Sequence, residues 1–391
     1  MYKVITFSTL LSSLLFSEGF EYKGNISFES AYSKHEMKDK REKQNALRLA
    51  LELKQKTLNG QFVFNGKAIV DYNDKERRYF DANDFYYKHN FENSDLLIGR
   101  NTRFWGAMSF YNHTDNFNTK DWLDNPFDYD SKLGTNNIAY TYYFENAEFS
   151  VIAKINEGVQ KVQEKESVNT FLPPSYKNKL ETQEGKNRPT VYLKYSGSAE
   201  EMQLDYSFIY QNGYDEQRYL VPVGQELWQH AYLVDKVMAY ATLVNGETLY
   251  KTELAYTKSN DKKVSDYAQI SLGLEHTFYG VWDKSDLGLL AEYYNYDARD
   301  GSKLGAKDFG NLFTDDFTLG FRLSINDSSD SDVLGGISID RDNQEKIIFI
   351  EYNTRLLEKY RLKLSYQHLS PKSKSHFEEI DWTRVELGYY F

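Results

Sequence analysis

The chain has 391 residues and no cysteine, and its Asp and Glu outnumber its Lys and Arg to give a net charge of −11. The lack of cysteine excludes a disulfide framework and thiol chemistry. No apolar run after the N-terminal segment approaches the roughly 20 residues that a membrane helix needs, which excludes a helical membrane protein. The many aromatic residues (33 Tyr and 25 Phe) and the few prolines (6) fit uninterrupted strands with aromatic belts.

The first predicted element is a secretory signal peptide over residues 1–19. A cationic start at Lys3 is followed by an apolar run over residues 4–16 and by small residues at Ser17 and Gly19. This order of segments is typical of a cleaved signal. A buried N-terminal helix is the alternative, but nothing afterwards is helical for it to pack on. We therefore expect cleavage before Phe20 and a single mature domain over residues 20–391.

The rest of the chain alternates apolar and polar residues with period two, which indicates β-strands with one apolar face. In residues 44–56, for example, four leucines share one face and Arg48 lies on the other. An even number of strands, 18, is predicted at residues 21–34, 44–56, 61–72, 83–92, 95–104, 137–144, 147–156, 190–196, 201–211, 230–244, 247–258, 266–278, 287–297, 315–325, 331–341, 346–355, 360–369 and 379–391.

The connections between these strands are short and long in turn. Short turns with hairpin chemistry follow the second, sixth and tenth strands, at residues 57–60, 145–146 and 245–246. Long stretches follow the first, third, fifth, seventh, ninth and thirteenth strands. Transmembrane barrels alternate short periplasmic turns with long external loops, and no repeating motif of a β-helix or propeller is present. The fold class predicted is all-β, a transmembrane antiparallel barrel of about 18 strands with a polar lumen and both termini on the periplasmic side.

The last strand alternates to its end, with Tyr389 and Phe391 on the apolar face and Arg384 on the polar one. It resembles the signal by which Gram-negative outer-membrane barrels are recognised for assembly. Together with the signal peptide and the 18 strands, it makes the whole chain similar to the 18-stranded, substrate-specific porin class. The residues Gly99-Arg100, Trp105-Gly106, Asp115 and Asn125-Pro126 also resemble a segment shared by poorly characterised barrel families of the porin type. These resemblances imply a location in the cell outer membrane, with its lipids and the barrel-assembly machinery as partners and with no substrate specified.

The connection after the fifth strand, residues 106–135, is the most informative candidate for a functional loop. In the porin class this loop folds into the barrel and narrows it. Here it contains an excess of acids over bases interleaved with aromatic residues, and folding inward would bury the rings. The candidate constriction residues are Asp115, Asp121, Asp124, Asp128 and Trp122. A lid packed over the mouth of the barrel is the alternative. The carboxylates of the loop would also suit Ca²⁺ as ligands. Their spacing matches no EF-hand, however, and a solvated acidic loop is favoured over a metal site.

Charged residues at lumen-facing positions follow from the strand register, since a Lys or Arg in the middle of the lipid face would cost about 2–4 kcal/mol. The basic ones predicted to line the pore are Arg48, Lys67, Lys154, Lys194, Lys251, Arg322, Lys363 and Arg384. They could form a ladder along one wall that guides carboxylates, as in substrate-specific members of the class. They could equally be structural, each paired across strands with an acid.

No catalytic, cofactor or metal site is predicted, and no nucleic-acid patch, phosphate loop or zinc spacing appears. Among the 7 histidines, only His113 lies near residues of a catalytic kind, Ser109 and Asp115. The function predicted is a porin through which small hydrophilic solutes diffuse passively, not an enzyme. An export or adhesion barrel that binds a polymer or surface partner through residues 157–189 and 212–229 is the alternative. The acidic loop predicts weak cation preference, with anionic solutes aided if the basic ladder exists.

Overall fold

The structure is a computed structural model that describes residues 19–35, 42–125, 128, 131–164, 172–282, 284–309, 311, 313–342, 344–370 and 379–391. Residues 1–18 of the expected signal peptide lie outside this range. Eighteen strands form one antiparallel sheet. They are β1 (Phe20–His35), β2 (Lys43–Thr57), β3 (Gly60–Asp71), β4 (Arg78–Asn90), β5 (Ser94–Asn101), β6 (Thr135–Tyr143), β7 (Ala147–Lys154), β9 (Thr190–Ala199), β10 (Leu204–Tyr214), β13 (Leu233–Asn245), β14 (Thr248–Ser259), β15 (Tyr267–Val281), β16 (Ser285–Ala298), β17 (Asp315–Ser324), β18 (Asp332–Asp340), β19 (Lys346–Leu356), β20 (Tyr360–Ser370) and β21 (Ile380–Tyr390).

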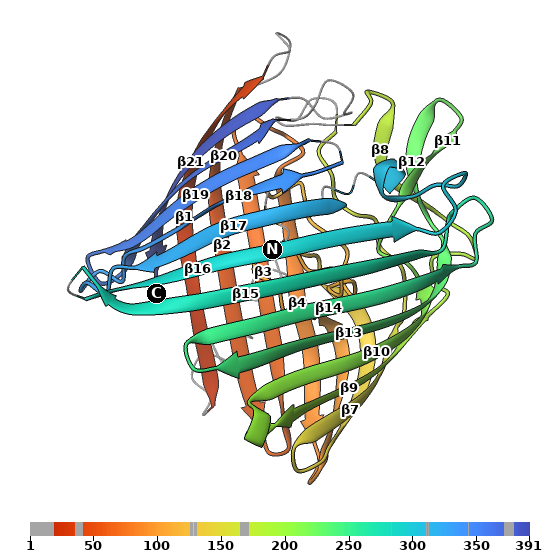
Figure 1. Ribbon diagram of the computed structural model, residues 1–391, viewed down its shortest axis with the longest axis horizontal. Helices are drawn as coiled ribbons and strands as arrows, with labels where there is room; N and C mark the ends of the chain where they lie inside the picture. Colours follow the sequence, from red (N-terminus) through yellow and green to blue (C-terminus); the bar gives the residue numbers. More distant parts are fainter. Residues whose placement is uncertain are drawn as a thin grey trace, which may run out of the picture.

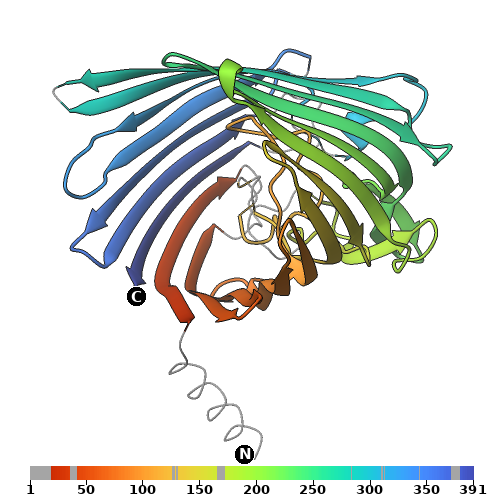
Figure 2. The same ribbon diagram turned by 90° about the horizontal axis from the view of Figure 1, so that it is seen from below.

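The sheet closes on itself because β1 pairs with β2 on one side and with β21 on the other. The two ends of the chain complete the joint, where Gly24 and Phe391 exchange backbone hydrogen bonds of 2.9 and 3.0 Å. Strands that follow one another along the ring are antiparallel neighbours throughout (Figures 1 and 2). A closed barrel leaves no unpaired edge, and none of the described helices could cross a membrane as a long apolar segment.

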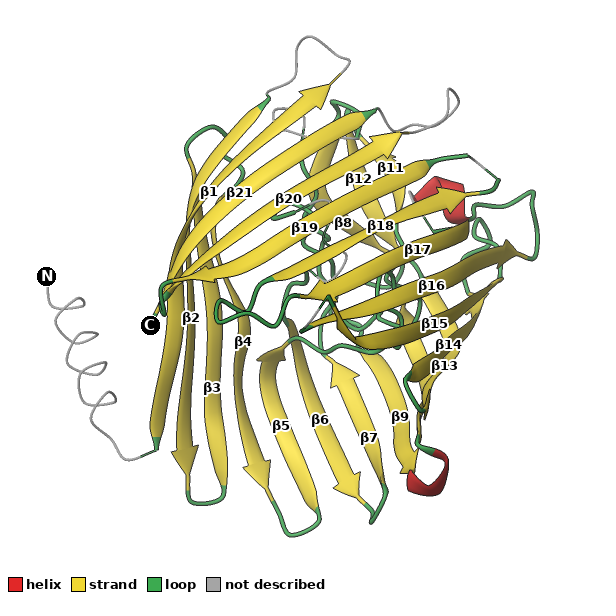
Figure 3. Ribbon diagram, turned by 60° about the vertical axis from the view of Figure 1, so that its left-hand side comes forward, coloured by secondary structure: helices red, strands yellow, loops and turns green. Residues whose placement is uncertain are grey.

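The predicted strands are confirmed, all 18 of them, because the period-two pattern that marks them is local in sequence. Leu47 and Leu49 of β2 lie exposed on the outer face, as the alternation requires. Figure 3 shows the short turns of β2–β3, β4–β5 and β6–β7 together at one end of the barrel. The largest difference is at β4, which begins at Arg78 and not at residue 83, and all other strand ends agree within three residues. The strand expected from residue 230 begins at Leu233, since His230 and Ala231 belong to another strand, β12 (Glu226–Ala231).

A small second sheet was not predicted. It lies within the long connections and is formed by β8 (Tyr176–Thr182), β11 (Tyr219–Val223) and β12 (Glu226–Ala231). The turn between β11 and β12 contains Gly224 at φ +63°, a left-handed conformation that glycine adopts without steric cost. Two short 3-10 helices, η1 (Glu200–Met202) and η2 (Ala306–Phe309), complete the described elements.

Candidate functional site

The connection between β5 and β6 lies inside the ring (Figure 2). Its backbone bonds to side chains of β14 and β16, its Asn116 donates to Gln211 of β10 at 2.7 Å, and its acids pair with β2 and β3. Phe110 meets Phe349 of β19 edge to face, with ring centroids 5.1 Å apart. Because these strands belong to different parts of the ring, the segment crosses the lumen.

Two glutamates of the wall hold the first arm of this segment by its backbone. Glu253 of β14 accepts N–H bonds from Ala107 at 2.7 Å and Thr114 at 3.1 Å. Glu292 of β16 accepts N–H bonds from Ser109 at 2.7 Å and Phe110 at 3.2 Å. Both carboxylates are buried, and a carboxylate acceptor makes a stronger hydrogen bond than a neutral one. Residues 107–114 therefore have a fixed position relative to the wall.

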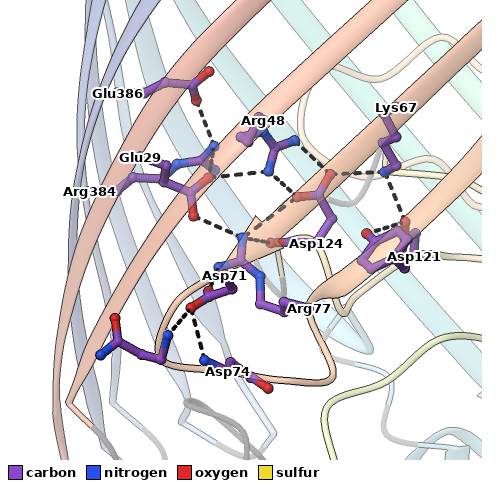
Figure 4. Close-up of polar contacts among 12 residues, drawn as sticks. Glu29, Arg48, Lys67, Asp71, Asp74, Arg77, Asp121, Asp124, Arg384 and Glu386 are labelled. Atoms are coloured by element: carbon purple, nitrogen blue, oxygen red, sulfur yellow. Dashed lines mark hydrogen bonds and ion pairs between the residues drawn. The ribbon is translucent and has the colours of Figure 1, made fainter.

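A cluster of charged side chains holds the second arm (Figure 4). Asp124 forms a two-point contact with the guanidinium of Arg48 from β2. Lys67 of β3 lies 2.9 Å from carboxylate oxygens of both Asp121 and Asp124. Burial by itself would raise the pKa of Asp124, but attraction to Arg48, Lys67 and Arg77 outweighs it and holds that pKa well below its ordinary value. The loop carboxylate is thus ionised and bound to the wall.

Arg77, in the turn between β3 and β4, lies at the centre of the same cluster and is fully buried. It contacts Asp71 at 2.6 Å and Glu29 of β1 at 2.8 Å, and it donates to the backbone oxygen of Asp124 at 3.2 Å. Arg384 of β21 contacts Glu29 at 2.7 Å from the other side. The cluster therefore joins the loop to β1, β2, β3 and β21, the strands on either side of the closure.

The predicted basic residues are distributed around the ring, and seven of the eight are paired with acids. Arg48, Lys67 and Arg384 come together in the cluster just described. The others are separate: Lys154 with Glu157 (2.9 Å), Lys194 with Glu148 (3.2 Å), Lys251 with Glu275 (2.9 Å) and Lys363 with Glu351 (2.7 Å). Arg322 is exposed on β17. The pairing matches the structural alternative for most of the set.

The loop acids are divided among different partners. Asp115 contacts Lys132 at 2.5 Å and Lys120 at 3.5 Å, whereas Asp121 and Asp124 contact the wall. Asp128 is exposed and Trp122 is half-buried, while residues 126, 127, 129 and 130 lie outside the described residues. Each of the three buried acids has a cationic partner. In the described part of the chain, the group with metal-ligand spacing is His368, Glu379 and Asp381, where Nδ1 of His368 already contacts Asp381 at 2.9 Å.

His113 lies in a structural setting. It is buried in the loop, its Nδ1 is 2.9 Å from Oγ of Ser271, and its ring packs edge to face on Tyr111 and Tyr294. Burial lowers its pKa to about 3, so the imidazole is neutral at physiological pH. These contacts fit a packed ring that supports the first arm of the loop.

A second buried cluster ties the external connections together. Lys236 of β13 contacts Asp215 at 2.7 Å and Glu216 at 2.9 Å, both just after β10. Arg218 contacts Glu157 at 2.7 Å, which links this connection to the one after β7. Burial first, and then the neighbouring Asp215, raises the pKa of Glu216 to about 8. One lysine between two carboxylates leaves one of them favouring the neutral form.

An opening of about 300 Å³ remains between the loop and the wall formed by β17 to β20. Ser109 and Phe110 line it from the loop, and Phe349, Glu351 and Lys363 line it from the wall. Sequence reasoning missed Phe349 and Arg77. Alternation places Glu253 and Glu292 on the lumen face, but it does not show that they bond to the loop backbone. The run of four apolar residues at 347–350 was a usable signal, because it breaks the alternation and places apolar side chains on the lumen face as well.

No family model matches the chain, and no curated protein sequence matches it either. Solved structures do resemble it. OccAB4 of Acinetobacter baumannii aligns with a TM-score of 0.60 at 8% identity, over 96% of this chain and 99% of that one. OccK8 (OprE) of Pseudomonas aeruginosa gives 0.57 at 9% identity, with the same coverage. A BenF-like porin of Pseudomonas fluorescens gives 0.58 at 8% identity, over 96% and 99%. The chain therefore has the 18-stranded barrel fold of these outer-membrane porins.

Proposed function

We propose that the chain is an outer-membrane porin through which small hydrophilic solutes diffuse passively. The observation that carries this proposal is the segment between β5 and β6, which crosses the lumen and is held to the wall at both arms. A channel of this kind selects by the size of its narrowest part and by the charges and hydrogen-bonding groups that line it. The similarity in fold to proteins described as porins supports the same function.

The outer face supports a location in the outer membrane. Large apolar and aromatic side chains lie exposed on outward positions all around the ring, among them Phe208, Leu254, Leu272 and Leu319. Such a band is what a barrel presents to lipid. We infer that outer-membrane lipids surround it, and that the assembly machinery acts on the last strand, with Tyr389 and Phe391 as the signal.

Planar bilayers test the proposal directly. Purified protein should give discrete channels in KCl, and removal of residues 112–130 should raise the single-channel conductance and loosen size exclusion, since it takes away most of the crossing segment. Heat-modifiability on gels would show that the shortened barrel still folds. Unchanged conductance in a folded deletion variant would contradict the role of the loop. A wild-type barrel that forms no channels would favour an export or adhesion barrel instead.

A further inference from the structure

The opening beside the loop has two different linings. On the loop side, Phe110 projects toward the wall and meets Phe349. The same apolar lining continues through Phe313 just before β17, Leu334 of β18 and Ile347 of β19. Phe313 in turn stacks on Tyr111 of the loop, with centroids 4.7 Å apart. Of these side chains Phe313 is buried, whereas Phe110, Leu334, Ile347 and Phe349 are half-buried and offer a surface that an apolar group of a solute can cover.

The other lining is polar: the wall contributes one ion pair, and Asn125 and Asp128 line the opening from the loop. Nζ of Lys363 lies 2.7 Å from Oε2 of Glu351, and the two side chains are 40% and 25% exposed. Asn353 donates to the other oxygen of Glu351 at 3.0 Å and fixes its position. Ser365 and Gln367 extend this polar surface along β20. Both charges of the pair are therefore within reach of a solute in the opening.

From these two linings we propose that the opening binds small zwitterions with an apolar side chain, of the size and chemistry of leucine or phenylalanine. The inference rests on the proposed function as a channel. A zwitterion can exchange partners with the pair, its carboxylate meeting Lys363 and its ammonium meeting Glu351, so neither protein charge loses a partner. A simple anion or cation that binds one member leaves the other uncompensated, which is costly where water is partly excluded.

The size of the opening agrees with this class of ligand. A volume of about 300 Å³ is at the small end for organic ligands. Within it, the apolar side chain would lie against Phe110 and Phe349 while the charged groups face Glu351 and Lys363. Three comparison solutes each lack one feature of this class. Glycine has both charges but lacks the apolar group, benzoate has a ring and only a negative charge, and phenethylamine has a ring and only a positive charge.

The experiment measures how strongly each of these solutes reduces the KCl current of single channels at neutral pH. L-Phenylalanine and L-leucine should halve the current at concentrations roughly fivefold or more below those needed for glycine, benzoate or phenethylamine. Phe349→Ser should raise the half-blocking concentration of phenylalanine by roughly threefold to tenfold and leave glycine unchanged.

Two charge variants give crossed results that a structural role would not produce. Glu351→Gln leaves Lys363 unpaired, so benzoate should block the current at a lower concentration relative to phenylalanine. Lys363→Met leaves Glu351 without its cationic partner, so phenethylamine should instead block at a lower concentration relative to phenylalanine. Lys179→Met is the matched control, because it removes an ion pair of equal length, 2.7 Å to Glu226, from the external sheet. This control should leave the half-blocking concentrations of all the solutes, relative to one another, unchanged.

Failure of this inference is distinct from failure of the proposed function. Open channels on which the five solutes act equally, or which benzoate blocks most strongly in the wild type, would overturn the zwitterion site and leave the porin function intact. Absence of channels would overturn the function itself. If Phe349→Ser lowers the yield of folded barrel, the two charge variants still decide between these outcomes.

Discussion

Arg77 illustrates that charged side chains of the lumen are paired with other side chains of the protein. Its side chain is fully buried and contacts Glu29 and Asp71, which are also buried. Removing one member of a buried ion pair destabilises a protein by about 3–5 kcal/mol, since the other charge is left without a partner. Residues of this cluster therefore act first as attachments of the loop and strands, and their charges reach a solute only in part.

Glu216 gives a prediction for the pH dependence of the external connections. Its pKa is raised from the ordinary 4.5 to about 8. Between these values the folded state holds a proton that the unfolded chain has released, so stability falls as the pH rises and the contribution is lost above pH 8. Raising the pH from 7 to 9 should increase proteolytic cleavage near residues 157–160 and 215–218 by about tenfold, since one pKa unit corresponds to about 1.4 kcal/mol.

Glu216→Gln is the informative variant, because it keeps the neutral form at every pH. Its cleavage rate should stay nearly constant from pH 7 to pH 9. Glu226→Gln, in the exposed pair with Lys179, is the control and should behave as the wild type. An equal rise in cleavage with pH in Glu216→Gln would show that another group is responsible.

Among the elements, β14 and β16 determine where the first arm of the loop lies. Glu292→Ala removes the acceptor for the N–H groups of Ser109 and Phe110, whose loss of partners costs about 1–3 kcal/mol each where water cannot replace them. We expect a noisier and larger open-channel current, measured in single-channel recordings. Glu275→Ala removes the same charge from the neighbouring strand, where the carboxylate contacts Lys251 and not the loop backbone. Identical currents in the two variants would mean that charge alone, not the position of the loop, sets the conductance.

The strands could be predicted from the sequence because period-two alternation is visible within each segment. The contacts of the loop could not, because they join residues far apart: Ala107 and Glu253 are separated by 146 positions. Alternation indicates that Glu253 faces inward but not which N–H group it meets. The small sheet was missed for a related reason. β8 is short and charged, and it pairs in parallel with β12, so its pattern resembles an ordinary polar connection.

At the scale of the whole molecule, the last residue extends the pairing of β1 with β21 that closes the ring. Phe391 forms two backbone hydrogen bonds with Gly24, and its ring covers that glycine so closely that an added Cβ would lie 2.8 Å from a ring carbon. Deleting Phe391 should lower the amount of folded, heat-modifiable barrel in outer membranes, while Phe391→Tyr, which keeps an aromatic end, should not. Wild-type levels after the deletion would refute the role of this residue in assembly.

The ion selectivity of the channel follows from the balance of charge in the lumen. The excess of acids in the loop predicts weak cation preference, but Asp121 and Asp124 are neutralised by Arg48, Lys67 and Arg77. Two unit charges about 4 Å apart interact by about 1 kcal/mol in water and several times more at lower dielectric, so paired charges of this kind contribute little to the field along the channel. The remaining preference in the wild type should be small and in favour of K⁺.

Removing the two loop acids should reverse that preference. In the double variant Asp121→Asn, Asp124→Asn, Lys67 loses both of its acid partners, and Arg48 retains Glu29 but loses Asp124. The loop also loses its second attachment to the wall, so both changes admit more Cl⁻. Reversal potentials under a KCl gradient should change sign, whereas Asp297→Asn, in an exposed pair with Arg299, should leave them as in the wild type. Continued cation preference in the folded double variant would show that charges elsewhere set the selectivity. Screening over about 8–10 Å leaves only the charges at the narrowest part effective. Clear anion preference in the wild type, abolished by neutralising Lys154 and Lys194, would therefore establish a basic ladder that acts there despite its ion pairs.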